Sequence, residues 1–339
     1  MATIISEESL KQLAGGLLKA GCRVIAPVRQ QDMVVYKAIK DPQEMAADTE
    51  YVLPQSSFKE FLFPRCECIL RYRIGEDKKP VYESPNLDAE PPQAVIGCRP
   101  CDAASLPILD KIFGWDYQDQ FYFKRREKLT VVSIACSRAA ERCFCTSVGC
   151  APDSATGSDV LLKKCGNGKY LAEALTDKGK QLVEKFASLF EKADAAPAAE
   201  VAQVKAAFDA EKIKPWLDAH FEDPMWLEIA ARCMGCGTCA FGCPTCHCFD
   251  IVDEGDLKGG CRLRNWDTCG SALFTKHGSG HNPRSSQEQR YRQRVMHKYK
   301  YYVEKFGLRA CTGCGRCCVR CPVNLDLCAV LQTIASRQA

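Results

Sequence analysis

The sequence predicts two domains, an N-terminal α/β (or α+β) domain over residues 1–220 and a mostly helical C-terminal domain over 221–339. Strand-like apolar runs alternate with a helical pattern in the first half of the chain. From residue 225 onward, cysteines recur at a regular spacing instead. With 339 residues, 46% of them hydrophobic, the chain is long enough to bury a core and to form about two domains.

The N-terminal domain is predicted to begin with one helix and two short strands. Residues 1–21 place leucines on one helical face, Ser6 is suited to cap the helix, and Gly21 ends it. Strand-like runs follow at 22–28 and 33–39.

A strand–helix–strand unit comes next and indicates parallel strands. Residues 93–98 form a buried apolar run, Asp102 can cap the following helix, and 129–135 form a second apolar run. The Ala-, Lys- and Glu-rich stretch 172–231 has helical spacing, and 193–199 is expected to link its helices.

Composition and charge narrow the class of protein. The net charge of +4 lacks the strong basic bias of nucleic-acid-binding proteins, so no nucleic-acid partner is expected. The 24 cysteines, in a long chain with an ordinary core, indicate metal ligation in a reducing compartment rather than a disulfide scaffold. Because the start has no signal-peptide pattern and no apolar run could span a bilayer, we expect a cytoplasmic protein without membrane insertion.

Two cysteine motifs, 78 residues apart, carry the prediction of function. They are Cys233-x-x-Cys236-x-x-Cys239-x-x-x-Cys243-Pro244 and Cys311-x-x-Cys314-x-x-Cys317-x-x-x-Cys321-Pro322. Each has the spacing of bacterial ferredoxins, in which three cysteines hold one [4Fe–4S] cluster and the fourth holds the other. Small glycines between the cysteines allow the tight loop that aims three thiolates at one cluster. The C-terminal domain is therefore predicted to be a dicluster domain of the ferredoxin type.

The crossing of the fourth cysteines assigns the ligands. One cluster is expected on Cys233, Cys236, Cys239 and Cys321, and the other on Cys311, Cys314, Cys317 and Cys243. The alternative is a pair of zinc sites, but these usually pair two C-x-x-C knuckles rather than run four cysteines together. Two close clusters without an obvious substrate pocket indicate electron transfer, and no catalytic residue is expected.

A second group of cysteines lies in the N-terminal domain. Cys101 and Cys136 each follow a predicted parallel strand, at the sheet edge where open α/β sheets bind their ligands. Together with Cys143 and Cys145 they could hold a third cluster. The alternative is that all four are buried apolar cysteines of the core.

The other cysteines and the basic residues each leave two interpretations open. Cys246, Cys248 and Cys269, with Cys261 nearby, either bind a further metal or pack around the first two clusters. The segment 284–309 holds eight Lys/Arg against two Glu, which indicates either a solvated helix face or a docking surface for an acidic partner. The cysteines treated as structural are Cys22, Cys66, Cys68, Cys165, Cys318 and Cys328.

Nucleotide-binding fingerprints are missing from the sequence. Neither G-x-G-x-x-G nor a phosphate loop occurs, so the chain is not expected to bind a nicotinamide dinucleotide itself. The missing fingerprint is weaker evidence against a flavin site than against a nicotinamide site, because flavin sites need not carry it.

A set of short motifs between about residues 26 and 326 resembles the iron–sulfur beta subunit of cytoplasmic sulfhydrogenases and the related iron–sulfur subunit of anaerobic sulfite reductase. These motifs are Gly97-Cys-Arg-Pro-Cys-Asp102, Arg125-Arg-Glu127, Cys143-Phe-Cys-Thr-Ser147, Cys243-Pro-Thr-Cys-His-Cys248, Gly280-His-Asn-Pro-Arg284, Arg292-Gln-Arg294, His297-Lys298 and Cys314-Gly-Arg-Cys317. The resemblance implies cysteine ligands at Cys101, Cys136, Cys143 and Cys145, which supports the third cluster. Cys66, Cys68, Cys98, Cys150, Cys261 and Cys318 lie outside the family's pattern and leave room for a local variation in cofactor content.

The resemblance also implies the partners. It suggests that the chain passes electrons between a flavin- and NAD(P)H-binding subunit and a catalytic partner. That catalytic partner is a hydrogenase, a sulfite reductase or a heterodisulfide-reductase-like complex. The chain is then an electron-transfer component rather than the substrate-converting subunit. Two alternatives stay open: a flavoenzyme with its own flavin site, and a redox-sensing or zinc-stabilised interaction module.

Overall fold

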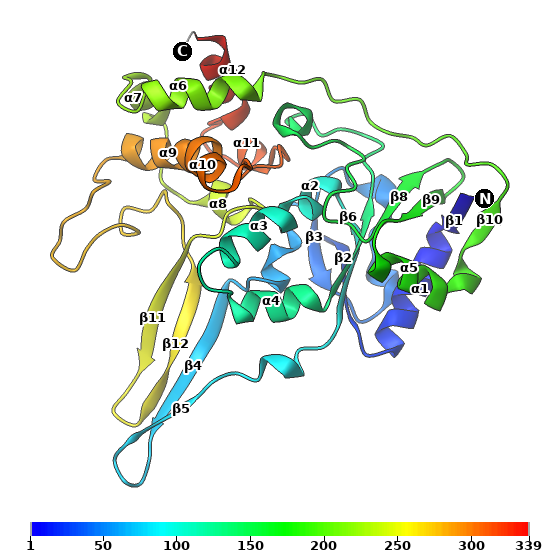
Figure 1. Ribbon diagram of the computed structural model, residues 1–339, viewed down its shortest axis with the longest axis horizontal. Helices are drawn as coiled ribbons and strands as arrows, with labels where there is room; N and C mark the ends of the chain where they lie inside the picture. The colour runs from blue at the N-terminus through cyan, green and yellow to red at the C-terminus, as the bar shows by residue number, and fades with distance from the viewer. Residues whose placement is uncertain (1, 338–339) are drawn as a thin grey trace.

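Two β-sheets organise the computed structural model, which describes residues 2–337 (Figure 1). Within those residues the larger sheet has eight strands in the order β10-β1-β9-β8-β7-β6-β2-β3. The smaller sheet has four strands in the order β11-β12-β4-β5 and extends from the rest of the molecule like an arm. The chain is thus a mixed α/β protein with one large sheet.

The large sheet has a parallel centre and antiparallel edges. Strands β2, β6, β7 and β8 run parallel to one another, whereas β3, β9, β1 and β10 are added antiparallel. The expected parallel pairing of 93–98 with 129–135 is therefore confirmed. The strands are β1 (Ala2–Ser6), β2 (Arg23–Gln30), β3 (Met33–Ala38), β6 (Gln93–Cys98), β7 (Leu129–Ile134), β8 (Val160–Lys164), β9 (Lys169–Ala174) and β10 (Glu191–Ala193).

Helices cover both faces of the large sheet, which explains why its central strands are continuously apolar. Every residue of β6 is buried. Helices α1 (Glu7–Lys19) and α5 (Asp177–Lys185) pack on one face. Helices α2 (Pro100–Ala103), α3 (Ser105–Phe113) and α4 (Gln120–Glu127) pack on the other.

The start of the chain combines a confirmed cap with a helix that is shorter than expected. The Ser6 hydroxyl accepts a hydrogen bond from the amide of Ser9 at 3.0 Å, as an N-cap should. Residues 2–6 form strand β1 rather than the first turn of the helix, because they pair with both β9 and β10.

Two further expectations for the N-terminal half are wrong. Asp102 does not cap a helix but lies inside α2, whose N-cap is Arg99. The helical expectation for 172–231 fails for part of that stretch: α5, α6 and α7 lie in it, and 193–199 separates α5 from α6 as expected, but β10 and the end of β9 are strands and the described residues 194–209 contain no helix. Pairing of β9 with β8 and β1, together with burial of Tyr170, overrides the helical preference of the Ala-, Lys- and Glu-rich sequence.

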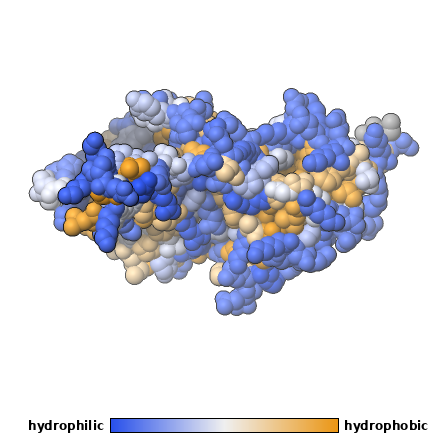
Figure 2. Space-filling model, turned by 90° about the horizontal axis from the view of Figure 1, so that it is seen from below, coloured by the Kyte–Doolittle hydropathy of each residue, from blue (hydrophilic) through white to orange (hydrophobic). Residues whose placement is uncertain are grey.

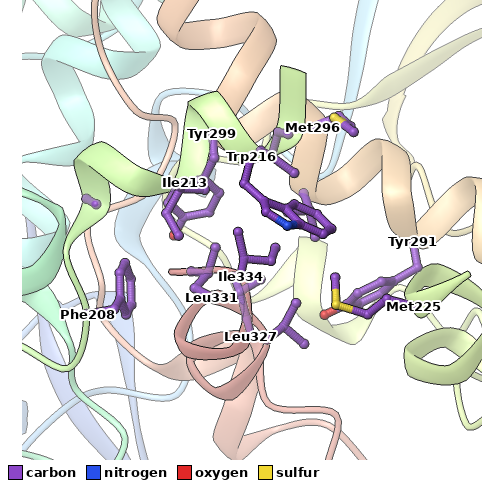
Figure 3. Packing of buried hydrophobic residues seen from close by; sticks show 14 of the residues in the cluster. Phe208, Ile213, Trp216, Met225, Tyr291, Met296, Tyr299, Leu327, Leu331 and Ile334 are labelled. Atoms are coloured by element: carbon purple, nitrogen blue, oxygen red, sulfur yellow. The ribbon is translucent and has the colours of Figure 1, made fainter. Parts of the chain in front are cut away.

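The C-terminal third packs short helices around a separate apolar core. Figure 3 shows this core, in which Trp216, Tyr299 and Leu331 come together from three different segments. Residues from Phe208 onward contribute to it, so the boundary near 220 stays a prediction. The helices are α6 (Ile213–Ala219), α7 (Met225–Ala230), α8 (Thr238–Phe241), α9 (Gln287–Met296), α10 (Tyr302–Phe306), α11 (Arg316–Val319) and α12 (Leu327–Ser336), with a π-helical turn at His297–Tyr301.

A β-hairpin interrupts these helices and was not expected. Strands β11 (Phe249–Gly255) and β12 (Gly259–Trp266) form the hairpin, and β12 pairs antiparallel with β4 (Cys66–Ile74). Strand β5 (Pro80–Glu83) completes the small sheet, which therefore joins the N-terminal and C-terminal parts of the sequence.

The surface is largely polar on the face that Figure 2 shows, with separate apolar patches between hydrophilic areas. No helix in residues 2–337 combines the length and the apolar character needed to cross a membrane.

A buried ion pair connects the large sheet to the second cysteine motif. The guanidinium of Arg316, on α11, donates to both carboxylate oxygens of Asp102 at 2.6 and 2.7 Å. The Tyr36 hydroxyl donates to the same carboxylate at 2.8 Å, and Arg316 Nε donates to the carbonyl of Pro54. Both members of the ion pair are almost completely shielded from water. Both carboxylate oxygens and all three guanidinium nitrogens thus have partners, as buried charges require.

We expect Asp102→Asn to destabilise the protein by about 3–5 kcal/mol, because the substitution leaves Arg316 buried without an anionic partner. Denaturant unfolding of the purified protein measures this loss. Asp253→Asn is the matched control, since Asp253 also accepts two hydrogen bonds from one arginine but at the exposed hairpin. Equal, small effects of the two substitutions would contradict a structural role for the buried pair.

Candidate metal centres

The two cysteine motifs fold into similar loops, each with a one-turn helix that carries the third cysteine. Helix α8 begins after Gly237 and α11 begins after Gly315, and both glycines have positive φ values, +72° and +74°. The expected role of the glycines in the loop backbone is confirmed. The amide of Gly313 donates to the Cys311 sulfur at 3.4 Å, so the loop directs backbone N–H groups at a thiol.

The first three cysteines of the first motif and the last cysteine of the second motif line one cavity. This cavity, of about 50 Å³, is bordered by Cys233, Cys236, Cys239 and Cys321, with Cys317 and Cys269 also at its wall. Helix α9 supplies polar donors: the Gln287 side chain donates to the Cys233 sulfur at 3.1 Å. Four thiols that converge on one cavity are the donor set that a [4Fe–4S] cluster requires.

The last cysteine of the first motif lies deep in the molecule beside the second motif. Cys243 and Cys314 are buried, and the charge of Cys243 raises the pKa values of Cys311 and Cys314, for which burial is the main cause of the shift. The pKa of Cys243 itself is well below its usual value, because Cys246 donates a hydrogen bond to it and Lys298 lies 3.4 Å from its sulfur. This environment favours a thiolate, the form that binds metal.

All four cysteines of the expected N-terminal site meet at the carboxyl edge of the parallel strands. Cys101 follows β6, Cys136 follows β7, and both line a single cavity with Cys143 and Cys145. Burial raises the pKa of Cys136 to about 11 and that of Cys145 to about 12. The topological argument about the sheet edge therefore placed these thiols correctly.

The N-terminal cysteines pack directly against the second motif. The amide of Phe144 donates to the carbonyl of Gly313 at 2.9 Å, and Cys314 lines the same cavity as Cys143. A Cβ atom on Gly313 would lie 2.5 Å from the Cα of Cys145. The two backbones are thus in van der Waals contact, with no room for a side chain between them.

A third group of thiols borders a neighbouring cavity, which shares Cys269 with the first. Cys246, Cys248 and Cys269 line it together with His297 and Lys298. Among residues 2–337, no three His, Cys, Asp or Glu side chains are arranged to hold a single metal ion. Cys261 lies apart from this group, on the small sheet beside Cys68.

Four of the eight cations in the basic segment 284–309 are turned inward, which corrects both interpretations of the sequence for these residues. Arg290, Arg292, Arg294 and Lys298 are all buried, although they belong to a stretch that was expected to be solvated or to dock a partner. Helical periodicity could not reveal the burial of these cations, because the residues that surround their side chains come from distant parts of the sequence. Sequence reasoning also missed Lys59, a buried lysine at the carbonyl of Cys246.

The contact between the N-terminal cysteines and the second motif makes Gly313→Ala a sensitive test. We expect this substitution to lower the free energy of unfolding by about 1–3 kcal/mol, because the new methyl group overlaps the Cys145 backbone. This loss comes in addition to the strain of placing an alanine at a positive φ. Gly307→Ala is the control: Gly307 has a similar φ of +68°, but a Cβ atom there would meet no atom within 4 Å. Thermal or denaturant unfolding compares them, and equal losses would mean that the close packing is unimportant.

Comparison with known proteins agrees with this geometry. Residues 232–325 match the family model described as the 4Fe–4S dicluster domain. The chain is 28% identical over 327 residues to sulfhydrogenase 2 subunit beta of Pyrococcus furiosus, an alignment that covers 94% of this chain and 93% of the relative. No solved structure matches the chain. The expected resemblance is confirmed: residues 232–325 match a 4Fe–4S dicluster domain, and the chain is similar along nearly its whole length to a sulfhydrogenase beta subunit.

Proposed function

We propose that this chain is the electron-relay subunit of a multisubunit oxidoreductase. It carries electrons between a flavin- and NAD(P)H-binding partner and a catalytic redox partner of the hydrogenase, sulfite reductase or heterodisulfide-reductase-like kind. The observation that carries the proposal is the shared cavity of Cys233, Cys236, Cys239 and Cys321, which combines thiols from both motifs. The name of the Pyrococcus furiosus relative, a sulfhydrogenase subunit, supports an assembly with further subunits.

Three thiol sets are the proposed cluster ligands. Cys233, Cys236, Cys239 and Cys321 hold the first [4Fe–4S] cluster, and Cys311, Cys314, Cys317 and Cys243 hold the second. Cys101, Cys136, Cys143 and Cys145 hold a third. Each cluster supplies one-electron redox chemistry when bound.

The surrounding residues are suited to stabilise the charge on these thiolates. Burial excludes water, while amides such as that of Gly313 and cations such as Lys298 face the sulfur atoms. Hydrogen bonds and charges of this kind set the reduction potential of an iron–sulfur site. The protein therefore acts by positioning and electrostatics, with no side chain that needs to react with a substrate.

The three proposed sites form a continuous series. Cys317 is assigned to the second site yet lines the cavity of the first, so those two sites share a wall. The third site meets the second where Phe144 contacts Gly313 and where Cys314 borders the N-terminal cavity. A series of this kind connects the edge of the large sheet to the C-terminal helices, as a relay requires.

The crossed ligand assignment can be tested by combining substitutions. We expect Cys233→Ala and Cys321→Ala each to lower iron and sulfide by about four atoms per chain, and the double variant to lose no more, since both remove one cluster. Cys233→Ala combined with Cys243→Ala should lose about eight, because two clusters are affected.

Metal and sulfide analysis of anaerobically purified protein, with electron paramagnetic resonance of the reduced state, gives the measurement. The opposite pattern would mean that each motif holds its own cluster. In that case the Cys233→Ala/Cys321→Ala variant would lose about eight iron atoms, and the Cys233→Ala/Cys243→Ala variant would lose only about four. Stoichiometric zinc with almost no iron in the unsubstituted protein would overturn the relay itself.

A further inference from the structure

Three cations are buried around the cavity that Cys246, Cys248 and Cys269 line. Lys59, Arg294 and Lys298 expose only 3%, 5% and 3% of their surface. Lys59 comes from the N-terminal part of the chain and lies over the ring of Trp266, at 4.2 Å from its centroid. The other two come from α9 and the π-helical turn that follows it.

None of these cations has a carboxylate among its hydrogen-bond partners in residues 2–337. Lys59 donates to the carbonyls of Cys246 and Ala240, and Arg294 donates to the Cys239 carbonyl and the Cys246 sulfur. Lys298 donates to the Cys243 sulfur, the Thr245 hydroxyl and the Ala310 carbonyl. Burying an ammonium or guanidinium group costs several kcal/mol unless a negative group lies nearby, so these contacts indicate an anionic centre.

The two dicluster sites supply only part of that negative charge. Lys298 reaches Cys243, a proposed ligand of the second cluster, and Arg294 reaches the backbone of Cys239, a ligand of the first. Lys59 makes no hydrogen bond to a sulfur of either ligand set among the described residues; its Nζ lies 2.7 Å from the carbonyl of Cys246. Lys59 therefore lies beside the third thiol group, where its ammonium would stabilise negative charge on those sulfurs.

The β11–β12 hairpin explains why these thiols meet. Phe249 and Trp266 are the first paired residues of the hairpin, so Cys248 and Cys269 lie just outside its base, before and after it. The amide of Asp267 donates to the carbonyl of Cys248 at 3.0 Å and holds the two segments together. Cys246 lies two residues before Cys248 on the same loop. The hairpin thus brings thiols from two separate parts of the sequence to one cavity.

His297 is a further side chain at this cavity that can bind iron. Its imidazole lines the cavity wall, at the start of the π-helical turn. π-Helical turns are often found at functional sites, and neutral imidazole is a good metal ligand. The cavity is only about 10 Å³, so the groups that line it, rather than its size, indicate a ligand.

We propose that Cys246, Cys248 and Cys269 bind a further [4Fe–4S] cluster, with His297 as its fourth ligand. Lys59, Arg294 and Lys298 then balance the negative charge of the thiolates. The site goes beyond the relay proposed above, because its ligands lie outside both ferredoxin-type motifs and outside the N-terminal set. Arg294 and Lys298 connect it to the first and second sites, so it would exchange electrons with either.

Cys248→Ser and Cys269→Ser test the proposal in the full chain. Each should lower iron and acid-labile sulfide by about four per chain, while the electron paramagnetic resonance signals of the other clusters remain. Cys165→Ser is the control, because Cys165 lies at the β8–β9 turn and is expected to leave the iron content unchanged. Unchanged iron in both test variants, or bound zinc that disappears with them, would overturn the proposal but leave the relay intact.

His297 and Lys59 give readouts that do not depend on losing a ligand thiol. We expect His297→Ala to lose the same cluster and His297→Cys to restore it, because a fourth thiolate completes a four-cysteine set. Lys59→Met should keep the iron content but lower one midpoint potential, since removing a nearby positive charge disfavours the reduced state. A His297→Ala variant with full iron content, or unchanged potentials in Lys59→Met, would contradict these assignments.

Discussion

The need to balance buried charge among closely spaced thiols governs the C-terminal half of this protein. Cysteine ligands of a metal are thiolates, and a cluster of thiolates in a low-dielectric interior is unstable without nearby cations. Arg294 and Lys298 meet this need with side chains that make no carboxylate contact among the described residues. They lie on α9 and the turn after it, so one short segment electrostatically supports several thiol groups at once.

The large sheet provides the frame that positions the N-terminal thiols beside the second cysteine motif. Its parallel centre ends at an edge where Cys101 and Cys136 emerge, and the second ferredoxin-type loop packs against that edge. The Asp102–Arg316 pair joins the two: its carboxylate and guanidinium both act on the Cys101 thiol, and its guanidinium also acts on Cys314. Sheet and loops are therefore joined by a buried ion pair and by direct contact between their backbones.

Local patterns in the sequence predicted the parts of the structure that depend on local interactions. The Ser6 cap, the buried strand 93–98 and the two cysteine loops follow from residue types and spacing alone. The meeting of Cys101, Cys136, Cys143 and Cys145 was also predictable, because a general rule states where parallel strands present their ligands. What could not be predicted depends on contacts between distant segments. The β12–β4 pairing, the strand character of 169–174 and the burial of Lys59 are decided by partners far away in the sequence.

The inward orientation of the basic residues couples metal binding to folding. A chain that buries Lys59, Arg294 and Lys298 without their anionic partners would carry an unfavourable excess of positive charge in its core. Metal binding then contributes to the free energy of folding, since buried thiols such as Cys239, whose pKa burial raises to about 11, become thiolates only as the metal displaces their protons. Sequence composition hides this coupling, because the net charge of the chain is only +4. The distribution of the cations, rather than their number, is what identifies the C-terminal core as one built around clusters.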